Sequence, residues 1–196
     1  KTLHEYIKIK KYYLKSSFML IKKTKFNGLK IIKSKKNIDF RGNLVETYRK
    51  KLIKGKDLVF DYKVFSKKNI LRGFHFQYKH GQIKYVSVLK GKILDCVIDL
   101  RRNSKTFGKT FKIVLSEKNG LSLYVPAGFA HSYLTLAKEN IVYYKLSEYY
   151  YPKSENGILW NDKDLKIKWP IKNPKISQKD KKLLTFKNFV KNFRYL

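Results

Sequence analysis

The chain has 196 residues, of which 43% are hydrophobic and 15% aromatic, so it can bury a core and is neither a disordered tail nor a fibre. Its 46 lysines and arginines exceed its 14 acidic residues by 32, a balance that raises nucleic-acid binding as a first possibility. The lysines are spread along the whole chain, however, and only six of the basic residues are arginines, whose forked guanidinium suits base and phosphate recognition. We therefore predict no specific nucleic-acid partner.

The sequence predicts a cytoplasmic protein without membrane insertion. A single cysteine, Cys96, excludes an intramolecular disulfide, and its apolar neighbours favour a buried thiol in a reducing compartment. The longest uncharged stretch, residues 119–137, is interrupted by glycines and a proline and is unsuited to a membrane-spanning helix. Residues 1–20 carry charges throughout and contain no apolar segment typical of a signal peptide.

No linker and no internal repeat interrupts the chain, so we predict one folded unit with three parts. Residues 1–21 form a basic N-terminal extension, residues 22–184 the main domain, and residues 185–196 a helical tail that packs on the same domain. Short β runs separated by turns predict an all-β sandwich or barrel. These runs are Lys84–Lys90, Lys92–Leu100, Thr110–Leu115, Leu121–Val125 and Asn140–Leu146.

Two of these runs carry more specific signals. The segment Ile93–Asp99 is apolar on both faces apart from its two acids, which predicts a central strand. Asn119-Gly120 between two apolar runs is the strongest hairpin signal in the chain.

His75 lies in the alternating segment Leu71–Gln77, which predicts a strand with Arg72 on one face and His75 with Gln77 on the other. An isolated histidine in a strand is usually a hydrogen-bonded core residue. Here an arginine three residues earlier, a nearby lysine and a tyrosine-rich segment supply the residue types of an anion clamp, a base, an electrophile and an acid, which favours a functional role.

His131 closes the pattern Gly120-x5-Pro126-x-Gly128-x-x-His131, which matches the second half of the cupin signature. Metal-binding cupins also need a His-x-His pair followed by a glutamate, whereas this chain has His75-Phe76-Gln77. Two imidazoles are a poor ligand set for a transition metal. We therefore predict that the protein uses no metal and no cofactor.

The C-terminal quarter predicts an extended segment followed by a helix. Prolines between Trp160 and Pro174 forbid a helix there and suggest a chain that lies over the sheet. A helix is indicated further on by an apolar stripe at spacings of three, four and three residues, comprising Leu183, Phe186, Val190 and Phe193.

Five ordered motifs resemble the dTDP-4-dehydrorhamnose 3,5-epimerase family, and their order and spacing match across roughly residues 22–180. They are Asp39-x-Arg41-Gly42; Leu71 to Gln77; Asp95 to Arg101 with Ser104-x-Thr106-x-Gly108; Val125 to His131; and Ile158 to Asp162 with Ile167 to Pro170. The resemblance implies a homodimeric cupin jelly roll (double-stranded β-helix) with a short C-terminal helix, acting without metal on a nucleotide-linked 4-keto-6-deoxy sugar.

The resemblance also implies roles for individual residues. His75 matches the general base, Asp180 the carboxylate that orients it, Tyr144 the acid on the opposite face of the sugar, and Lys84 the cation near the keto oxygen. The chemistry fits these types, since removing a hydrogen α to a ketone leaves enolate charge on its oxygen. The implied substrate contacts are Arg41, Glu46, Arg72, Gln77, His131 and Tyr150.

Simpler interpretations stand beside four of these assignments. Asp180 also completes a capping box that begins at Ser177. Lys84 is also one lysine among many, and Arg41 also suits a residue that pins a turn. A one-residue slip would place the ring of Tyr143 rather than that of Tyr144 in the site.

The sequence supports an epimerase that inverts C3, C5 or both carbons and serves deoxysugar and surface-polysaccharide biosynthesis. Two alternatives remain, a 3,4-ketoisomerase of the same substrate class and a non-enzymatic basic RNA-associated protein. Phe60 and Tyr62 stand where the family usually shows a Gln-x-Asn pair that touches the nucleotide or sugar, so the resemblance does not extend to nucleotide and sugar specificity.

Overall fold

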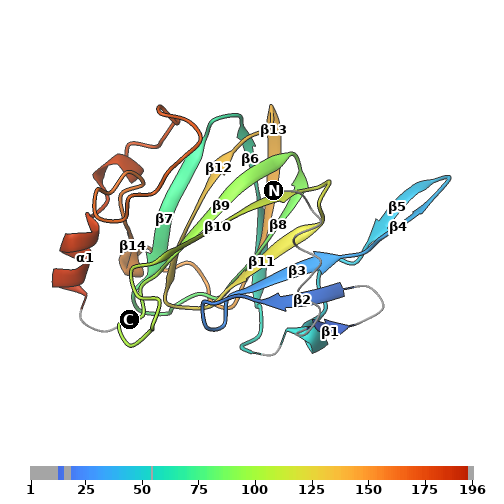
Figure 1. The fold of residues 1–196 in the computed structure, drawn as a ribbon, viewed down its shortest axis with the longest axis horizontal. Coiled ribbons are helices and arrows are strands. Elements are labelled where there is room, and N and C mark those ends of the chain that lie inside the picture. Colours follow the sequence, from blue (N-terminus) through green and yellow to red (C-terminus); the bar gives the residue numbers. More distant parts are fainter. Residues whose placement is uncertain (1–12, 16–18, 54, 194–196) are drawn as a thin grey trace.

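The computed structural model describes residues 13–15, 19–53 and 55–193, which form two antiparallel β-sheets, a projecting hairpin and a C-terminal helix (Figure 1). The larger sheet contains, in spatial order, β1 (Tyr13–Lys15), β2 (Met19–Lys23), β3 (Lys30–Ser34), β11 (Leu121–Val125), β8 (Lys84–Lys90), β13 (Glu139–Leu146) and β6 (Phe60–Lys67). The smaller sheet contains β10 (Thr110–Ser116), β9 (Lys92–Asp99), β12 (Phe129–Thr135), β7 (Leu71–Gln77) and β14 (Glu155–Gly157). These sheets confirm the predicted all-β class.

The remaining elements are short. The strands β4 (Lys36–Asp39) and β5 (Gly42–Val45) pair only with each other, and this hairpin extends away from the sheets on the side opposite the helix (Figure 1). Single 3-10 turns lie at η1 (Lys50–Leu52), η2 (Pro152–Ser154) and η3 (Asp180–Lys182), and the helix α1 spans Phe186–Asn192. No helix in the described ranges is long and apolar enough to cross a membrane.

The main core lies between the two sheets. Val86 and Val142 of the larger sheet pack in one buried cluster with Ile93, Val97 and Phe129 of the smaller sheet. The predicted central strand is confirmed, because β9 has neighbours on both sides and its residues from Cys96 to Asp99 are buried. Each sheet therefore presents one face to a shared apolar layer between the sheets.

The predicted hairpin at Asn119-Gly120 is wrong. The strand before it, β10, pairs with β9, whereas the strand after it, β11, pairs with β3 and β8 in the other sheet. The Asn119 carboxamide oxygen accepts hydrogen bonds from the backbone N–H groups of Ser116 and Leu121 at 3.1 and 3.0 Å, respectively. The turn therefore carries the chain from one sheet to the other, which turn-residue chemistry alone does not distinguish from a hairpin.

The predicted alternation along β7 is also interrupted. Phe74 is buried against the C-terminal segment, whereas Arg72 lies on the side of His75 and lines the same groove. The interruption occurs at Gly73, whose φ is +99° and whose position leaves no room for a side chain, since a Cβ there would lie 2.4 Å from the His131 carbonyl oxygen. The pairing of β7 with β12 shifts register at the same place.

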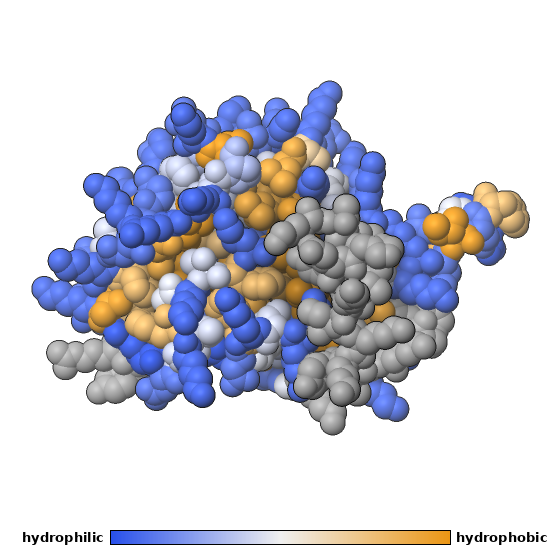
Figure 2. All heavy atoms as spheres, in the orientation of Figure 1, coloured by the Kyte–Doolittle hydropathy of each residue, from blue (hydrophilic) through white to orange (hydrophobic). Residues whose placement is uncertain are grey.

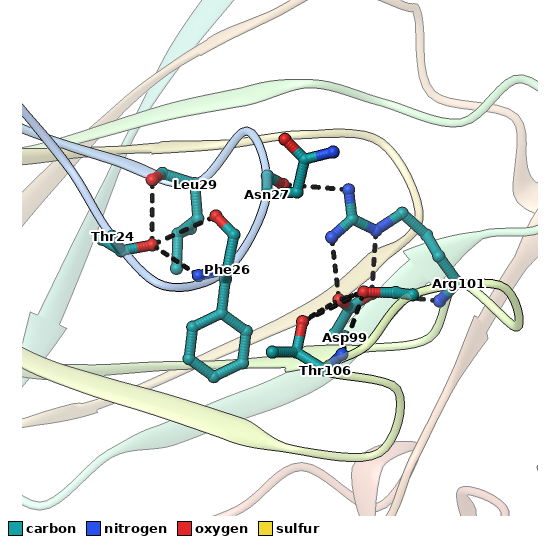
Figure 3. Close-up of polar contacts among 8 residues, drawn as sticks. Thr24, Phe26, Asn27, Leu29, Asp99, Arg101 and Thr106 are labelled. Atoms are coloured by element: carbon teal, nitrogen blue, oxygen red, sulfur yellow. Dashed lines mark hydrogen bonds and ion pairs between the residues drawn. The ribbon is translucent and has the colours of Figure 1, made fainter.

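The motif around Asp99 is structural (Figure 3). The Asp99 carboxylate accepts hydrogen bonds from the Arg101 guanidinium, Ser104 Oγ and Thr106 Oγ1 at 2.6–2.8 Å. Arg101 also donates to the Asn27 carbonyl at 3.0 Å, which ties the β9–β10 loop to the β2–β3 turn. A surface hollow of about 780 Å³ lies over these residues, but the polar groups of Asp99, Arg101, Ser104 and Thr106 bond to one another.

The C-terminal segment crosses the outer face of the smaller sheet, as predicted. Parallel bridges join Ile70 to Lys175 and Ile158 to Leu184. The Thr185 side chain caps α1 by accepting from the Asn188 N–H at 3.1 Å. The helix is confirmed, but its deepest residue is Phe189, which the predicted stripe omitted and which is fully buried. The stripe residues Phe186, Val190 and Phe193 are half-buried around it.

The division into an extension, a main domain and a tail remains a prediction. The strand β2 begins at Met19, so the larger sheet starts before the boundary expected at residue 22. Residues 1–12 and 194–196 of the predicted extension and tail lie outside the described residues.

We predict that Phe189→Ala lowers the free energy of unfolding by about 3–5 kcal/mol, because it removes a fully buried ring that packs on Phe76 and Phe193. Urea denaturation followed by circular dichroism measures the change. Phe65→Ala is the control, since that ring is more than half exposed and its removal should cost about 1 kcal/mol or less. Equal losses in both variants would contradict the central packing role of Phe189.

Candidate active site

His75 and Asp180 form a hydrogen-bonded pair in which His75 Nε2 lies 2.8 Å from Asp180 Oδ1. The second Asp180 oxygen accepts from the Gly73 N–H at 3.1 Å, so the carboxylate is held from two directions. Burial acts to raise the pKa of Asp180, but the hydrogen bonds from His75 and Gly73 hold it below its ordinary value. Asp180 is therefore an ionised acceptor at neutral pH.

The structure shows the contacts that bear on both interpretations of Asp180. Ser177 Oγ accepts from the Asp180 N–H at 3.0 Å, which is one half of the expected capping box. The Asp180 carboxylate, however, bonds to Gly73 and His75, and the 3-10 turn that it opens ends at Lys182. The helix α1 has its own cap at Thr185, so the carboxylate is available for the histidine.

Lys84 begins β8 and is buried next to His75, and its Nζ donates to the His75 carbonyl oxygen at 3.3 Å. Burial lowers the pKa of Lys84 to about 8, although the negative charges of Glu155 and Asp95 act in the opposite direction. It is thus not one more solvated lysine. A buried ammonium with a lowered pKa beside a histidine–carboxylate pair is typical of a functional site.

Tyr144 is buried with its ring among other aromatic side chains of the same interior. It stacks on Tyr62 at a centroid distance of 5.0 Å and meets the edge of His131 at 5.8 Å. Burial raises the pKa of Tyr144 well above its ordinary value, and Tyr133 and Tyr62 add to the rise, so its phenol is protonated at neutral pH. His131 in turn bonds through Nε2 to the buried Asp95 carboxylate at 2.8 Å.

The neighbouring Tyr143 faces the other side of the sheet. Its hydroxyl donates to Asp61, an exposed carboxylate on β6, and Lys145 lies beside both. The register therefore points Tyr144, not Tyr143, toward the interior.

A cavity of about 340 Å³ opens between the sheets at this point, and His75, Gln77, Lys84 and Tyr150 line it. The Gln77 carboxamide is already hydrogen-bonded within the protein. It donates to the His80 and Tyr149 carbonyls and accepts from the Tyr151 N–H. Its bonds hold the loop after β13 in place. The Tyr150 hydroxyl donates to Glu155 at 2.7 Å on the rim.

Arg72 lies in a second groove of about 410 Å³ that also contains His75 and Asp180. Two of its guanidinium nitrogens donate to Ser66 Oγ at 3.3 Å. Burial raises the pKa of Tyr133, and the charge of Arg72 acts to lower it. The groove and the cavity meet at His75, so a ligand that spans both would contact Arg72 and Lys84 together.

Arg41 and Glu46 are not brought to this site within one chain. Arg41 lies at the tip of the β4–β5 hairpin, where its guanidinium pairs with Asp39 at 2.7 Å and is largely exposed. Glu46 follows β5 and pairs with Arg49. The turn-pinning interpretation of Arg41 thus describes its contacts in a single chain.

Sequence reasoning assigned no role to Glu155 and noted Phe60 and Tyr62 only as departures from the family, yet all three line the cavity. Glu155 pairs with Lys179, which precedes Asp180, and so ties β14 to the segment that carries the carboxylate. Acidic residues are few in this basic chain, and that scarcity was the available sequence signal for a role of Glu155. The aromatic residues at positions 60 and 62, where the family usually shows a Gln-x-Asn pair, were the signal for the other two.

Within the described part of the chain, no three histidine, cysteine or acidic side chains converge as a metal site would require. His75 and His131 each bond to a separate carboxylate, Asp180 and Asp95. The site is therefore built from pairs suited to proton transfer, with a lysine as its cation.

Comparison with known proteins identifies the family. The family model for dTDP-4-dehydrorhamnose 3,5-epimerase matches residues 23–188. The enzyme of that name from Methanothermobacter thermautotrophicus is 39% identical over 166 residues, which cover 81% of this chain and 90% of that protein.

Two solved structures are similar in fold as well. A dTDP-6-deoxy-D-glucose-3,5-epimerase from Legionella pneumophila, in complex with dTDP-4-keto-L-rhamnose, is 36% identical with a TM-score of 0.81 and covers 84% of this chain and 91% of its own. A 3'-monoepimerase from Streptomyces bikiniensis, in complex with dTDP-quinovose, is 27% identical with a TM-score of 0.81 and covers 86% and 88%.

These likenesses confirm the predicted cupin jelly roll and the predicted isomerase class. They favour an epimerase over the ketoisomerase and the RNA-associated protein that the sequence left open. The chain belongs to the dTDP-4-dehydrorhamnose 3,5-epimerase family.

Proposed function

We propose that the protein inverts C3, C5 or both carbons of a nucleotide-diphosphate-linked 4-keto-6-deoxy sugar, by removing a proton next to the ketone and returning one to the opposite face. The observation that carries this proposal is the His75–Asp180 pair beside the buried ammonium of Lys84. A base and a cation at adjacent positions are what enolate formation requires.

The hydrogen bond between His75 and Asp180 sets which imidazole nitrogen is basic. An ionised carboxylate only accepts hydrogen bonds, so the proton of the neutral ring sits on Nε2, the nitrogen 2.8 Å from Asp180. The lone pair of Nδ1 then remains to take the proton from the sugar. Asp180 also stabilises the imidazolium that results.

Lys84 would meet the negative charge that moves to the ketone oxygen. Its burial removes competing water, which strengthens its attraction for the enolate. Glu155 and Asp95 act to keep it protonated in this interior position.

Tyr144 would deliver the second proton. Its phenol is neutral at pH 7, so an O–H is present to form the new C–H bond on the face away from His75. The phenolate and the imidazolium left by the two transfers return to their starting states by exchange with solvent. Inversion therefore needs both groups, whereas exchange of the substrate hydrogen with solvent needs only the base.

We also propose that the active form is a homodimer in which the β4–β5 hairpin of one chain reaches the site of the other. The hairpin projects from the body, and apolar surface is visible on the projection at the right of Figure 2. Its exposed apolar side chains are Ile38, Phe40 and Leu44. Covering them would remove apolar surface from water. The same contact would bring Arg41 to a substrate diphosphate that it does not reach within its own chain.

A cytoplasmic location and a role in deoxysugar supply for surface polysaccharide complete the proposal. The buried free thiol of Cys96 is compatible with a reducing compartment.

We predict that His75→Ala lowers deuterium exchange at every sugar carbon by about 100- to 10,000-fold, since it removes the base.

Tyr144→Phe should lose net epimerisation while exchange continues, because the base and the enolate site remain. Incubation with dTDP- and GDP-linked 4-keto-6-deoxyhexoses in D2O, followed by NMR and mass spectrometry, measures both rates.

Tyr143→Phe is the matched control, since that ring faces outward and should change neither rate. If Tyr144→Phe reduced exchange and epimerisation equally, Tyr144 would be a wall of the site and not the acid. If the wild type exchanged no hydrogen of either substrate, the proposed function would be wrong for both nucleotides.

We predict that the rate falls as pH rises through about 8, because the Lys84 ammonium has its pKa near that value and loses its proton above it. The rate at pH 9 should be lower than at pH 7 by about tenfold, as one titrating group requires. Initial rates at saturating substrate between pH 6 and 9.5 measure this profile.

Lys84→Arg tests the assignment of that profile. Its guanidinium keeps its charge over the whole range, so any activity that it retains should not show the fall. An unchanged alkaline fall in Lys84→Arg would assign it to a group other than Lys84.

We predict that two inactive variants restore activity when they are mixed and refolded together. One carries Arg41→Ala and the other His75→Ala, and each alone is nearly inactive at substrate concentrations below KM. A mixed dimer then has one site with both His75 and the partner's hairpin intact. Equal amounts should recover about a quarter of the wild-type rate, since half the dimers are mixed and each has one intact site. No recovery, in a sample shown to contain mixed dimers, would place Arg41 in its own chain's site or outside both.

A further inference from the structure

Tyr62 lines the candidate site and lies against the ring of Tyr144. The two residues face each other across adjacent strands, Tyr62 on β6 and Tyr144 on β13. Their rings stack with a centroid distance of 5.0 Å and an angle of 28° between planes. Tyr62 also lines the cavity that contains His75 and Lys84. It therefore lies between this cavity and the ring of Tyr144.

The orientation of Tyr144 depends on what surrounds its ring. His131 meets it edge-on at 5.8 Å and Tyr133 lies tilted at 6.5 Å, and both belong to the buried strand β12. Tyr62 covers the ring from the edge of the larger sheet, and 43% of its own surface is exposed. If Tyr62 were reduced to a short side chain, Tyr144 would keep its buried neighbours but lose the stacked ring on this side.

Tyr62 is itself held by a row of aromatic contacts. Phe60 lies 6.0 Å from Tyr62, and Tyr149 stacks on Phe60 at 5.5 Å with 20° between planes. Stacked and tilted aromatic pairs of this kind contribute stability beyond the area that they bury. A continuous row of ring contacts thus runs from Tyr149, in the loop after β13, through Phe60 and Tyr62 to Tyr144.

We propose that Tyr62 is a positioning residue that holds the Tyr144 ring in the orientation from which it protonates the enolate, and that it thereby sets the ratio of inversion to simple exchange. This rests on the proposed function. An enolate formed by His75 has two fates: its carbon accepts a proton from His75 on the original face, or one from Tyr144 O–H on the opposite face. Only the second inverts the carbon.

The ring of Tyr62, rather than its hydroxyl, carries this role. Burial raises the pKa of Tyr62 to about 12, so the side chain is a neutral phenol throughout the working range. Tyr62→Phe keeps the stacked ring and removes only the hydroxyl, whereas Tyr62→Asn removes the ring and keeps a polar group of moderate size. These two variants separate the two contributions.

The experiment compares wild type, Tyr62→Phe, Tyr62→Asn and Phe65→Asn as matched control. Phe65 lies on the same strand but faces away from the cavity, and it is also more than half exposed. Each protein is incubated with dTDP-4-keto-6-deoxyglucose in D2O, and NMR gives the rates of deuterium entry and of inversion at C3 and C5. The measured quantity is the ratio of exchange to inversion at each carbon.

We expect this ratio to rise by about tenfold in Tyr62→Asn, because a misplaced acid slows inversion while the base still acts. Tyr62→Phe and Phe65→Asn should keep the wild-type ratio. A merely structural role of Tyr62 would lower both rates together and leave the ratio unchanged, which would overturn the proposal. A large loss of inversion in Tyr62→Phe would also overturn it, since Tyr62 would then act through its own hydroxyl.

A second measurement needs no substrate. In protein labelled with ¹³C at the tyrosine rings, the Tyr144 signal is identified by its loss in Tyr144→Phe, and its line shape reports ring flips. Flips should be slow in wild type and Tyr62→Phe and faster in Tyr62→Asn. Equal flip rates in all three would contradict the positioning role even if the enzyme were active. Absence of turnover with unequal flip rates would instead contradict the proposed function and leave Tyr62 as the residue that fixes Tyr144.

Discussion

The hydrogen bond between His75 and Asp180 is the contact on which the site depends. It joins β7 to a residue 105 positions later in the sequence, so it exists only when the C-terminal segment lies on the smaller sheet. The Lys175 carbonyl accepts from the Leu71 N–H at 3.0 Å, and the Gly157 carbonyl accepts from the Leu184 N–H at 3.2 Å. These two backbone contacts hold the segment on either side of Asp180, so the packing of the helix beyond them contributes to the orientation of the base.

The site also collects acidic residues in a chain that has few. Of the 14 in the sequence, Asp95, Glu155 and Asp180 lie within it, and each is paired with a basic group there. Burial lowers the pKa of Lys84, and the charges of Glu155 and Asp95 oppose that effect, so without them Lys84 would lose its proton more readily. The large positive charge of the surface therefore says little about the site, where Glu155 and Asp95 act on Lys84 and Asp180 pairs with His75.

Local sequence patterns predicted the strands β8 and β9 within one residue, because alternation and turn residues act over short distances. They failed where a distant contact decides the outcome. The Asn119-Gly120 turn has hairpin chemistry but joins two sheets, and Gly73 interrupts the alternation that placed Arg72 beside Phe74. Phe189 was missed because its burial depends on packing against Phe76 on β7, which is distant in the sequence. The resemblance singled out His75, Lys84, Tyr144 and Asp180, and the fold brings Lys84 and Asp180 into contact with His75.

The proposed proton-transfer residues lie on strands that are paired on both sides, whereas Tyr62 and Arg41 do not. His75, Lys84 and Tyr144 lie on β7, β8 and β13, each of which is paired on both sides. A shift of any of them would disturb two neighbouring strands, so their geometry is strongly fixed. Tyr62 lies on the edge strand β6, and Arg41 lies on a hairpin that pairs with neither sheet. Substitutions there disturb fewer contacts, so the proposed proton-transfer groups can be kept while the residue proposed to orient the acid, or the hairpin proposed to meet the substrate, changes.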